Sequence, residues 1–532
     1  MKALARDAIV LLALAAAGCS GPASPPVGHA MPSAPKPQAA ETTNDHALPG
    51  GIDWFTGGVE AALAESTRSG KPVMLYWGAV WCPPCHQLKA TVFSRTDFQQ
   101  KLKHFIPVYL DGDEPGAQKW GETFGVSGYP SVVILNGDRS EILRIAGGMD
   151  LGQYTTMLDA ALEDRRPAEA VLDKLARRGT NGTADECHRV AWQAWGLEDL
   201  EPAALARRGA RLAAAAQACT HRPVDERTRL AVFAAADLAR GMATGGDALP
   251  PALVARIGTL LSDHAAAAAQ MDALRSLAAD YFGALGARDA AQARVQLDHY
   301  IAAMRQAAES KAFVRGDQLN AIYSALVASR SLAKDGRPER QLADFARARV
   351  SQALAEPGPA AEHSSIINGV LNVLDGLRDD AQAFEINRRE AERSSSPYYY
   401  LGTLGDLAES MGRGTEALQW QAKAYASARG AATRFQWGSD YLRAMLRLAP
   451  NDLQGIRETG LAVLGELDAP DAIYRRSRTR LSKLDAALRD WAGMDDARRG
   501  VAAALRERVS RTCSKLAAAD PASATCRAFA GG

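Results

Sequence analysis

The sequence predicts two kinds of folded structure, an α/β domain from 51 to 165 and a larger all-α region from 166 to 532. Strand-like apolar runs alternate with helical segments only in the first of these parts, which is typical of an α/β sheet domain. The composition changes at Arg165-Arg166-Pro167, after which alanine, leucine and arginine dominate and no convincing β-run occurs. A length of 532 residues also exceeds that of a single ordinary domain.

Residues 1–19 have the pattern of an export signal. Lys2 and Arg6 supply positive charge, and the apolar run that follows is too short to span a bilayer as a helix. Ala16-Ala17-Gly18-Cys19 resembles a bacterial lipoprotein box, in which the cysteine is lipidated. Serine at the next position resembles lipoproteins that are sorted to the outer membrane. We therefore expect a periplasmic protein anchored through Cys19, with simple signal cleavage and soluble release as the alternative.

Residues 20–50 are rich in proline, alanine, serine and glycine. Such a composition cannot bury a core and is typical of a semi-extended tether. At about 3 Å per residue, the tether could hold the folded part up to ~90 Å from a membrane.

The α/β part contains a C-x-x-C pair in a redox context. The apolar run 73–77 predicts a strand, and His86 begins a segment that suits a helix, so Cys82 and Cys85 lie at a strand-to-helix turn. The first turn of a helix offers free N–H groups and the positive end of its dipole, which favour a thiolate over a thiol. We interpret Cys82 and Cys85 as a redox-active dithiol.

The residues between the cysteines limit how far the thiolate is stabilised. Pro83 and Pro84 have no N–H group, so Cys82 loses two potential backbone donors and keeps that of Cys85. We expect the pKa of Cys82 to lie below the free value of about 8.5 but above the ~3.5 of the most oxidising proteins with such a motif.

A second apolar strand, 131–135, begins directly after Tyr129-Pro130. We expect a cis bond before Pro130, which turns the backbone of Tyr129 toward the cysteines, where it can pair with an incoming peptide while Pro130 blocks metal capture. Asn136-Gly137 predicts a tight hairpin to a strand over 141–145. A helix from Leu151 to about Leu162 closes the domain.

Residues from about 52 to 164 resemble a thioredoxin-fold domain, in particular the family that includes the C-terminal domain of periplasmic thiol:disulfide interchange reductases. The resemblance is carried by Trp54, the helix 59–69, Gly70-Lys71-Pro72-Val73, Trp81-Cys82-x-x-Cys85, Val108-Tyr109-Leu110-Asp111 and Gly128-Tyr129-Pro130. It implies that Cys82 is the attacking thiol, Cys85 the resolving thiol and Pro130 the cis-proline, with Trp81 and Tyr129 beside the substrate. It further implies protein substrates, an upstream protein redox donor and no cofactor other than the dithiol.

The chain departs from this family at two positions. Many thioredoxins bury an aspartate six residues before the first active cysteine, where this chain has Tyr76, and the lysine that often accompanies it is replaced by Pro107. A water molecule or His86 would then have to accept the proton of Cys85.

Other interpretations of the motif are weaker. Cys82-x-x-Cys85-His86 is also the c-type haem attachment pattern, but a haem site requires neither the preceding strand nor Gly-Tyr-Pro. Zinc is not expected, because no second ligand pair lies nearby. For His86 we consider two roles, a solvated helix residue or a cation that stabilises the thiolate.

The four remaining cysteines suit disulfides in an oxidising compartment. Cys187 opens one helical stretch and Cys219 ends the next, so a helical hairpin would bring them together. Cys513 and Cys526 would then join the C-terminal helix to the tail. Four buried free thiols are the alternative.

The all-α region resembles tetratricopeptide repeats between about 364 and 450, where small and apolar residues such as Gly405, Ala408 and Gly412 recur at repeat positions. A stacked solenoid is expected. The scattered histidines are interpreted as structural or solvated residues. Tyr398-Tyr399-Tyr400 are interpreted as helix-packing residues, with a groove that binds peptides as the alternative. A net charge of +1 gives no footprint for nucleic acid.

Together these features predict a periplasmic thiol:disulfide oxidoreductase that acts in the reducing direction. The alternative is an interaction scaffold in which the helical region carries the function and the thioredoxin-like unit is a docking module.

Overall fold

The computed structural model describes residues 48–531, except for 49, 127, 147–150, 178–180, 197–199, 221–223, 243–247, 357, 469–471, 518–519 and 521. The predicted signal peptide with Cys19, and all of the tether except residues 48 and 50, lie outside the described residues.

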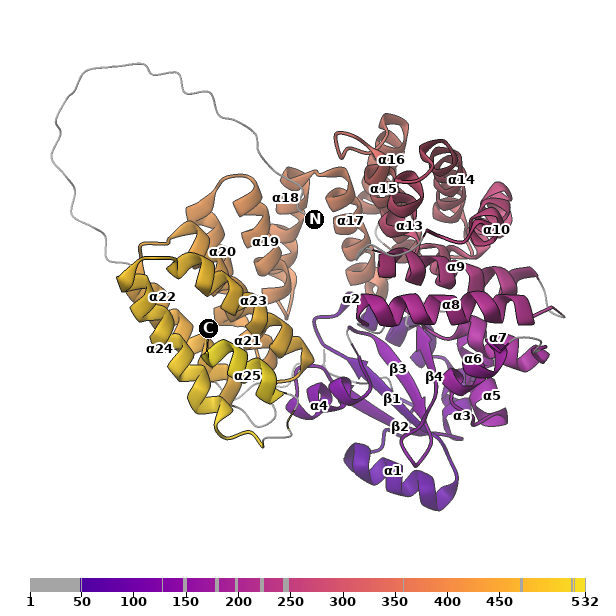
Figure 1. Ribbon diagram of the computed structural model, residues 1–532, viewed down its shortest axis with the longest axis horizontal. Helices are drawn as coiled ribbons and strands as arrows, with labels where there is room; N and C mark the ends of the chain where they lie inside the picture. Colours follow the sequence, from indigo (N-terminus) through magenta and orange to yellow (C-terminus); the bar gives the residue numbers. More distant parts are fainter. Residues whose placement is uncertain are drawn as a thin grey trace. The chain divides into compact units, whose positions relative to one another are not determined.

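The α/β part is built on a four-stranded sheet with the order β2-β1-β3-β4 (Figure 1). The strands are β1 (Val73–Gly78), β2 (Ile106–Asp111), β3 (Ser131–Leu135) and β4 (Glu141–Ala146), and the helices are α1 (Gly58–Ser69), α2 (Pro83–Leu88), α3 (Thr96–Leu102), α4 (Pro115–Thr123) and α5 (Leu151–Glu163). A single π-helical turn, Lys89–Phe93, continues α2. Strands β1 and β2 are parallel, whereas β3 is antiparallel to both of its neighbours.

All six residues of β1 are buried, because both faces of the sheet are covered. Met74 and Tyr76 belong to one hydrophobic cluster, and Leu75 and Trp77 belong to the other. This alternation follows from the two-residue period of a strand. It explains why the sequence has a continuous apolar run here instead of an alternating one.

The turn between β3 and β4 is wider than Asn136-Gly137 predicts. The backbone N–H of Asn136 donates to the Ser140 carbonyl at 2.9 Å, and the left-handed residue is Arg139, with φ 73°. The Asn136 side chain donates to Ser140 Oγ and to the Arg165 carbonyl, both at 2.9 Å. Because that side chain is engaged by the end of the domain, the two-residue turn gives way to a longer loop.

The all-α region begins with α6 (Ala168–Leu175), directly after α5. The helices that follow are α7 (Ala184–Trp192), α8 (Pro202–Ala218), α9 (Val224–Gly241), α10 (Pro251–Ser262), α11 (His264–Ala269), α12 (Met271–Leu274), α13 (Ala278–Gly286), α14 (Ala290–Glu309), α15 (Arg315–Leu332), α16 (Arg340–Ala355), α17 (His363–Leu377), α18 (Asp380–Arg393), α19 (Tyr398–Ser410), α20 (Gly414–Ser427), α21 (Ala431–Leu448), α22 (Leu453–Gly465), α23 (Arg475–Ala492), α24 (Asp496–Cys513) and α25 (Ala522–Ala530). Short 3-10 turns lie at Ala360–Glu362 and Glu466–Asp468.

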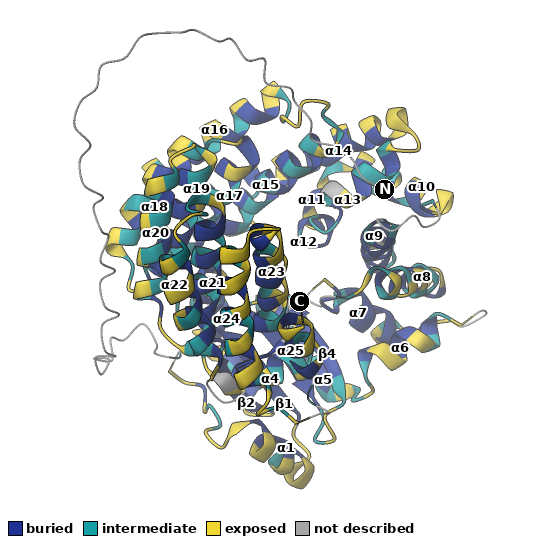
Figure 2. Ribbon diagram, turned by 60° about the vertical axis from the view of Figure 1, so that its left-hand side comes forward, coloured by how far each residue is buried: buried dark blue, intermediate teal, exposed yellow. Residues whose placement is uncertain are grey.

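Helices in this region pack on their neighbours in the chain and bury one face each (Figure 2). Between α19 and α20 the contact is close: a Cβ atom at Gly405 would lie 2.6 Å from the Gln421 side chain. A larger residue at this position would have to displace the Gln421 side chain, which gives a physical reason for glycine there. Among the described residues, no helix is both long and apolar enough to cross a bilayer.

Strand β4 lies at one edge of the sheet, and the first helices of the all-α region cover it. The Arg144 backbone N–H donates to Gln193 Oε1 at 2.7 Å, and the Ala194 N–H donates to the Arg144 carbonyl at 3.1 Å. Arg189, which is 1% exposed, donates to the Ile142 carbonyl at 2.7 Å. These bonds satisfy backbone groups that an edge strand would otherwise leave unpaired.

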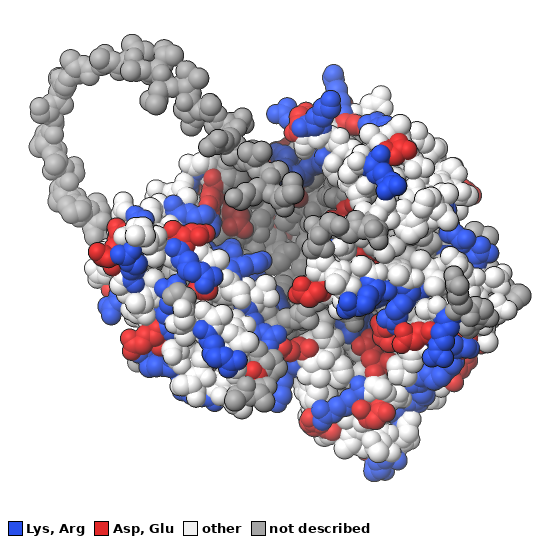
Figure 3. All heavy atoms as spheres, viewed as in Figure 1, with Lys and Arg blue, Asp and Glu red and all other residues white. Residues whose placement is uncertain are grey.

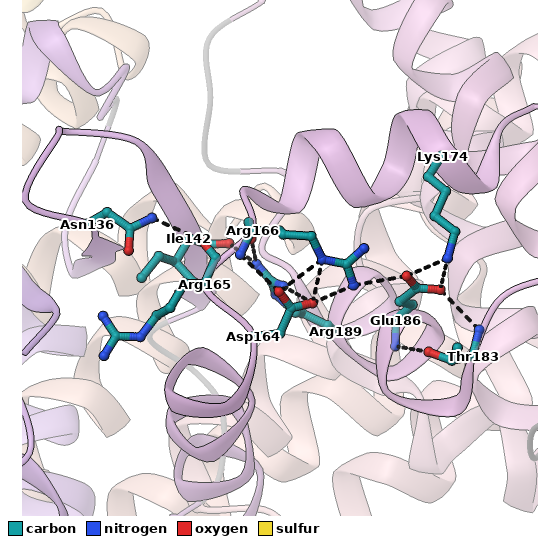
Figure 4. Close-up of polar contacts among 9 residues, drawn as sticks. All are labelled: Asn136, Ile142, Asp164, Arg165, Arg166, Lys174, Thr183, Glu186 and Arg189. Carbon is teal, nitrogen blue, oxygen red and sulfur yellow. Dashed lines mark hydrogen bonds and ion pairs between the residues drawn. The ribbon is translucent and has the colours of Figure 1, made fainter. Parts of the chain in front are cut away.

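A network of charged groups continues this junction (Figure 4). The buried carboxylate of Glu186 accepts from Lys174 Nζ at 2.6 Å, from Arg166 at 2.9 Å and from the Thr183 backbone N–H at 3.1 Å. Asp164 pairs with Arg166 at 2.8 Å and with Arg189 at 2.9 Å. The end of α5 is therefore tied to α6 and α7 by ion pairs as well as by chain connection.

We expect Glu186 to make folding depend on pH. Burial acts to raise the pKa of Glu186, but the hydrogen bonds from Lys174, Thr183 and Arg166 outweigh it and lower the pKa to about 2. A carboxyl with a lowered pKa in the folded state stabilises the protein above its unfolded pKa of about 4.5, and that contribution is lost as the pH falls toward 2. Glu186→Gln should lower the free energy of unfolding by about 1–3 kcal/mol at pH 7.

The measurement is urea unfolding at pH 7 and at pH 3, where the difference between Glu186→Gln and the parent should shrink. Glu392→Gln, at a side chain that is 66% exposed, is the matched control and should change little at either pH. An equal loss of stability for Glu186→Gln at both pH values would contradict this assignment.

Candidate redox site

Cys82 and Cys85 meet at the first turn of α2 and are joined by a disulfide, with 5.2 Å between their Cα atoms. Cys82 is the N-cap residue, and its Sγ accepts the backbone N–H of Cys85 at 3.2 Å. Pro83 and Pro84 occupy the first two helical positions, where a missing N–H does not weaken the helix. Among Pro83, Pro84 and Cys85, only Cys85 has a backbone N–H group to donate to Cys82, as the sequence predicts.

The Tyr129–Pro130 bond is cis. Tyr129 packs against the two cysteines, as does Trp81, and the two rings are 6.1 Å apart. The Tyr129 hydroxyl accepts from Gln118 Nε2 at 3.0 Å. Trp81, the dithiol and the cis peptide thus form one continuous surface.

Asp113 is a site residue that sequence reasoning missed. Trp81 Nε1 donates to both oxygens of its carboxylate, at 3.0 and 3.1 Å. Burial raises the pKa of Asp113 to about 6, although hydrogen bonds from Thr433 and Trp81 act in the opposite direction. One signal could have found it: β1 and β2 are parallel, so the loop after Asp111 lies at the same edge of the sheet as the C-x-x-C turn after Gly78.

His86 joins the redox site to the helical region. Its Nε2 lies 2.7 Å from the Val80 carbonyl, which can only accept, so Nε2 carries the hydrogen. Nδ1 lies 3.0 Å from Ser364 Oγ. The ring is half-buried and links α2 to α17.

The part of the chain that contains this site is similar to known proteins. The thioredoxin-like domain family matches residues 59–162. Residues 59–162 form a thioredoxin-like domain.

Two curated proteins are similar to this domain. Thiol:disulfide interchange protein DsbD 1 of Pseudomonas aeruginosa is 30% identical over 96 residues, which cover 17% of this chain and 16% of that protein. Tryparedoxin of Trypanosoma brucei brucei is 27% identical over 118 residues, covering 18% of this chain and 81% of that protein. A solution structure of a thioredoxin from Thermus thermophilus is 25% identical, with 21% of this chain and 88% of that chain covered and a TM-score of 0.20. The family match ends at residue 162, before the helical region begins.

In place of the buried aspartate of many thioredoxins, the thioredoxin-like domain has Tyr76. This side chain is fully buried in β1, and burial together with the charge of Asp111 raises its pKa. Its hydroxyl has no hydrogen-bond partner among the described residues. Tyr76 therefore stays neutral at physiological pH and fills core space rather than accepting a proton.

The cysteines of the helical region lie far from this site in the chain and form two further disulfides. Cys187 of α7 is bonded to Cys219 at the end of α8, and Cys513 of α24 is bonded to Cys526. The residues that follow Pro521, expected as a tail, form helix α25. No group of three or more potential metal ligands occurs among the described residues.

Proposed function

We propose that this protein is a periplasmic thiol:disulfide oxidoreductase, tethered to the membrane through Cys19, that reduces disulfides of protein substrates. The observation that carries the proposal is the Cys82–Cys85 disulfide at the first turn of α2, with the Cys85 N–H directed at Cys82 Sγ. The name of the similar protein DsbD 1, a thiol:disulfide interchange protein, favours the same chemistry. Periplasmic location and lipid anchoring rest on residues 1–19 alone.

The reaction begins with the reduced protein. The Cys82 thiolate attacks one sulfur of the substrate disulfide, and a mixed disulfide forms while the other substrate sulfur leaves as a thiolate and takes up a proton. Cys85 then loses its proton and attacks Cys82 Sγ, which releases the second substrate thiolate. The substrate gains two electrons, and Cys82 and Cys85 end as the disulfide that the structure contains. An upstream dithiol protein must reduce that disulfide again.

Trp81 and Tyr129 flank the reacting sulfurs and would orient the substrate. The N–H of Cys85 supports the thiolate of Cys82, since a hydrogen bond to a charged form lowers its pKa. Figure 3 shows basic and acidic side chains intermingled over the described part of the face that it draws. A surface of this kind does not favour a nucleic-acid partner.

Equilibration of the full-length protein with a series of glutathione redox buffers tests the proposal. The fraction of protein with a reduced Cys82–Cys85 pair, measured by alkylation and mass spectrometry, should follow the buffer reversibly while Cys187–Cys219 stays oxidised. A Cys85→Ala variant should accumulate mixed disulfides with its substrates. A dithiol whose state never changes across the series, or a covalently bound porphyrin spectrum, would overturn the proposal.

One observation favours the second candidate, an interaction scaffold with the thioredoxin-like domain as a docking module. Side chains of the helical region contact Trp81, His86 and Asp113, so this face already has a binding partner within the chain. The scaffold predicts that substitution of Cys82 leaves the protein's partners unchanged.

A further inference from the structure

The dithiol is buried, and side chains of the helical region contact residues around it. Cys82 is 2% exposed and Cys85 is 0% exposed. We use the term redox face for Trp81, Cys82, His86, Asp113 and Tyr129. The residues of the helical region that contact this face or its surroundings, called the cover, are Asp317, Ser364, Tyr399, Thr433, Arg476 and Arg478. They come from five helices, α15, α17, α19, α21 and α23.

The cover occupies the aromatic side chains that flank the cysteines. Tyr399 stacks on Trp81 with 6.1 Å between ring centroids and 20° between planes. The Arg476 guanidinium lies 5.8 Å from the Trp81 ring and 5.2 Å from the Tyr129 ring. Trp81 and Tyr129 are the two residues expected beside a substrate, so cover and substrate need the same surface.

Polar contacts surround these rings. Thr433 donates to the Asp113 carboxylate that also holds Trp81, and His86 bonds Ser364 at 3.0 Å. The backbone also approaches closely, because a Cβ atom at Gly430, which has φ +72°, would lie 3.1 Å from the Asp113 carbonyl oxygen. The cavity lined by Thr433 and Arg476 has a volume of only about 10 Å³. That is room for about one water molecule.

We propose that the helical region is an intramolecular competitor for the redox face, so that the cover must leave the face before a protein disulfide can reach Cys82. The inference rests on the proposed function and adds how access to the site is controlled. While the cover lies on the redox face, the dithiol is shielded from protein thiols and disulfides. A protein partner that displaces the cover gains the aromatic surface of Trp81 and Tyr129.

The ion pair between Glu122 of α4 and Arg478 of α23 allows a sharp test, because it joins the thioredoxin-like domain to the helical region away from the cysteines. Both side chains are 19% exposed. Arg478→Glu places two like charges at this contact, and the charge swap Glu122→Arg/Arg478→Glu restores opposite charges. Arg447→Ala is the control, since Arg447 pairs with Glu409 inside the helical region at 2.7 Å.

The experiment uses the full-length chain with Cys85→Ala, so that Cys82 has no intramolecular partner, and measures the rate at which Cys82 reacts with a polyethylene-glycol maleimide. Arg478→Glu should raise the rate at least about tenfold, because like charges at an interface weaken the contact between the cover and the redox face. The charge swap should return the rate toward that of the parent, and Arg447→Ala should not change it. If Arg478→Glu fails to fold, Arg476→Ala provides the same comparison.

The proposal would be overturned if Cys82 in the parent reacts as fast as a free peptide thiol. It would also be overturned if neither Arg478→Glu nor Arg476→Ala changes the rate. The glutathione series separates this result from the proposed function. If the dithiol equilibrates with glutathione but Cys82 is not shielded from the maleimide, only the proposed role of the cover is refuted. If the dithiol is shielded from the maleimide and its state never changes across the glutathione series, the redox function is refuted and the cover is not.

Discussion

Cys82→Ser is expected to abolish the reduction of insulin disulfides by the full-length protein. Cys82 accepts the Cys85 N–H at the N-cap of α2, and its sulfur is the one that a strand-to-helix turn activates as a thiolate. A serine hydroxyl stays protonated at neutral pH and cannot attack a disulfide. The rate should fall by at least about 10³-fold, the order found when a covalent nucleophile is removed. Insulin turbidity with a dithiol reductant as electron donor measures it.

Cys85→Ser is the matched variant, since it keeps the attacking thiol and removes only the resolving one. It should lose turnover but form mixed disulfides in stoichiometric amount, which non-reducing electrophoresis detects. Equal turnover by the parent and by Cys82→Ser would contradict the assignment. No turnover in either, with Cys82 accessible to maleimide, would favour the scaffold instead.

Asp237→Asn is expected to lower the free energy of unfolding by more than Glu186→Gln does. Arg208 of α8 donates to Asp237 of α9 through Nε at 2.6 Å and through a second guanidinium nitrogen at 3.1 Å. The two side chains are 3% and 1% exposed. Removing the carboxylate charge breaks a buried ion pair, which costs about 3–5 kcal/mol. The free energy of unfolding, measured in urea at pH 7, should fall by that amount.

Asp344→Asn is the control for Asp237→Asn. Asp344 pairs with Arg347 at 3.4 Å, and the two side chains are 63% and 54% exposed. Exposed pairs of this kind are worth about 0–1 kcal/mol. Equal losses for the two variants would mean that the buried pair between α8 and α9 contributes no more than a surface pair.

Much of the site could be predicted from sequence because its determinants are local. Two prolines between Cys82 and Cys85 fix which N–H group remains, and the strand before them places the pair at a helix start. The cis peptide at Tyr129–Pro130 follows from one tripeptide within the thioredoxin-like resemblance. Cys187 and Cys219 lie on consecutive helices, so their pairing also needed only the helix pattern.

What escaped prediction depends on groups that are distant in the chain. Tyr399 was interpreted as a packing residue, which it is, but the ring that it stacks on is Trp81 of the other domain. Asp113 belongs to no sequence motif, and its contact with the helical region is made through Thr433. His86 was assigned to solvent or to the thiolate because no local pattern points to Ser364.

The sequence by itself determined the chemistry of this protein: two sulfurs at the start of a helix beside a cis-proline, and a long amphipathic helical region behind them. Only the tertiary structure determines that the two sulfurs are buried. Hydrophobic periodicity states which face of a helix is buried but not which surface buries it, because apolar contact is non-directional. The stacking of Tyr399 on Trp81 and the burial of Cys82 therefore arise only when residues more than two hundred positions apart come together.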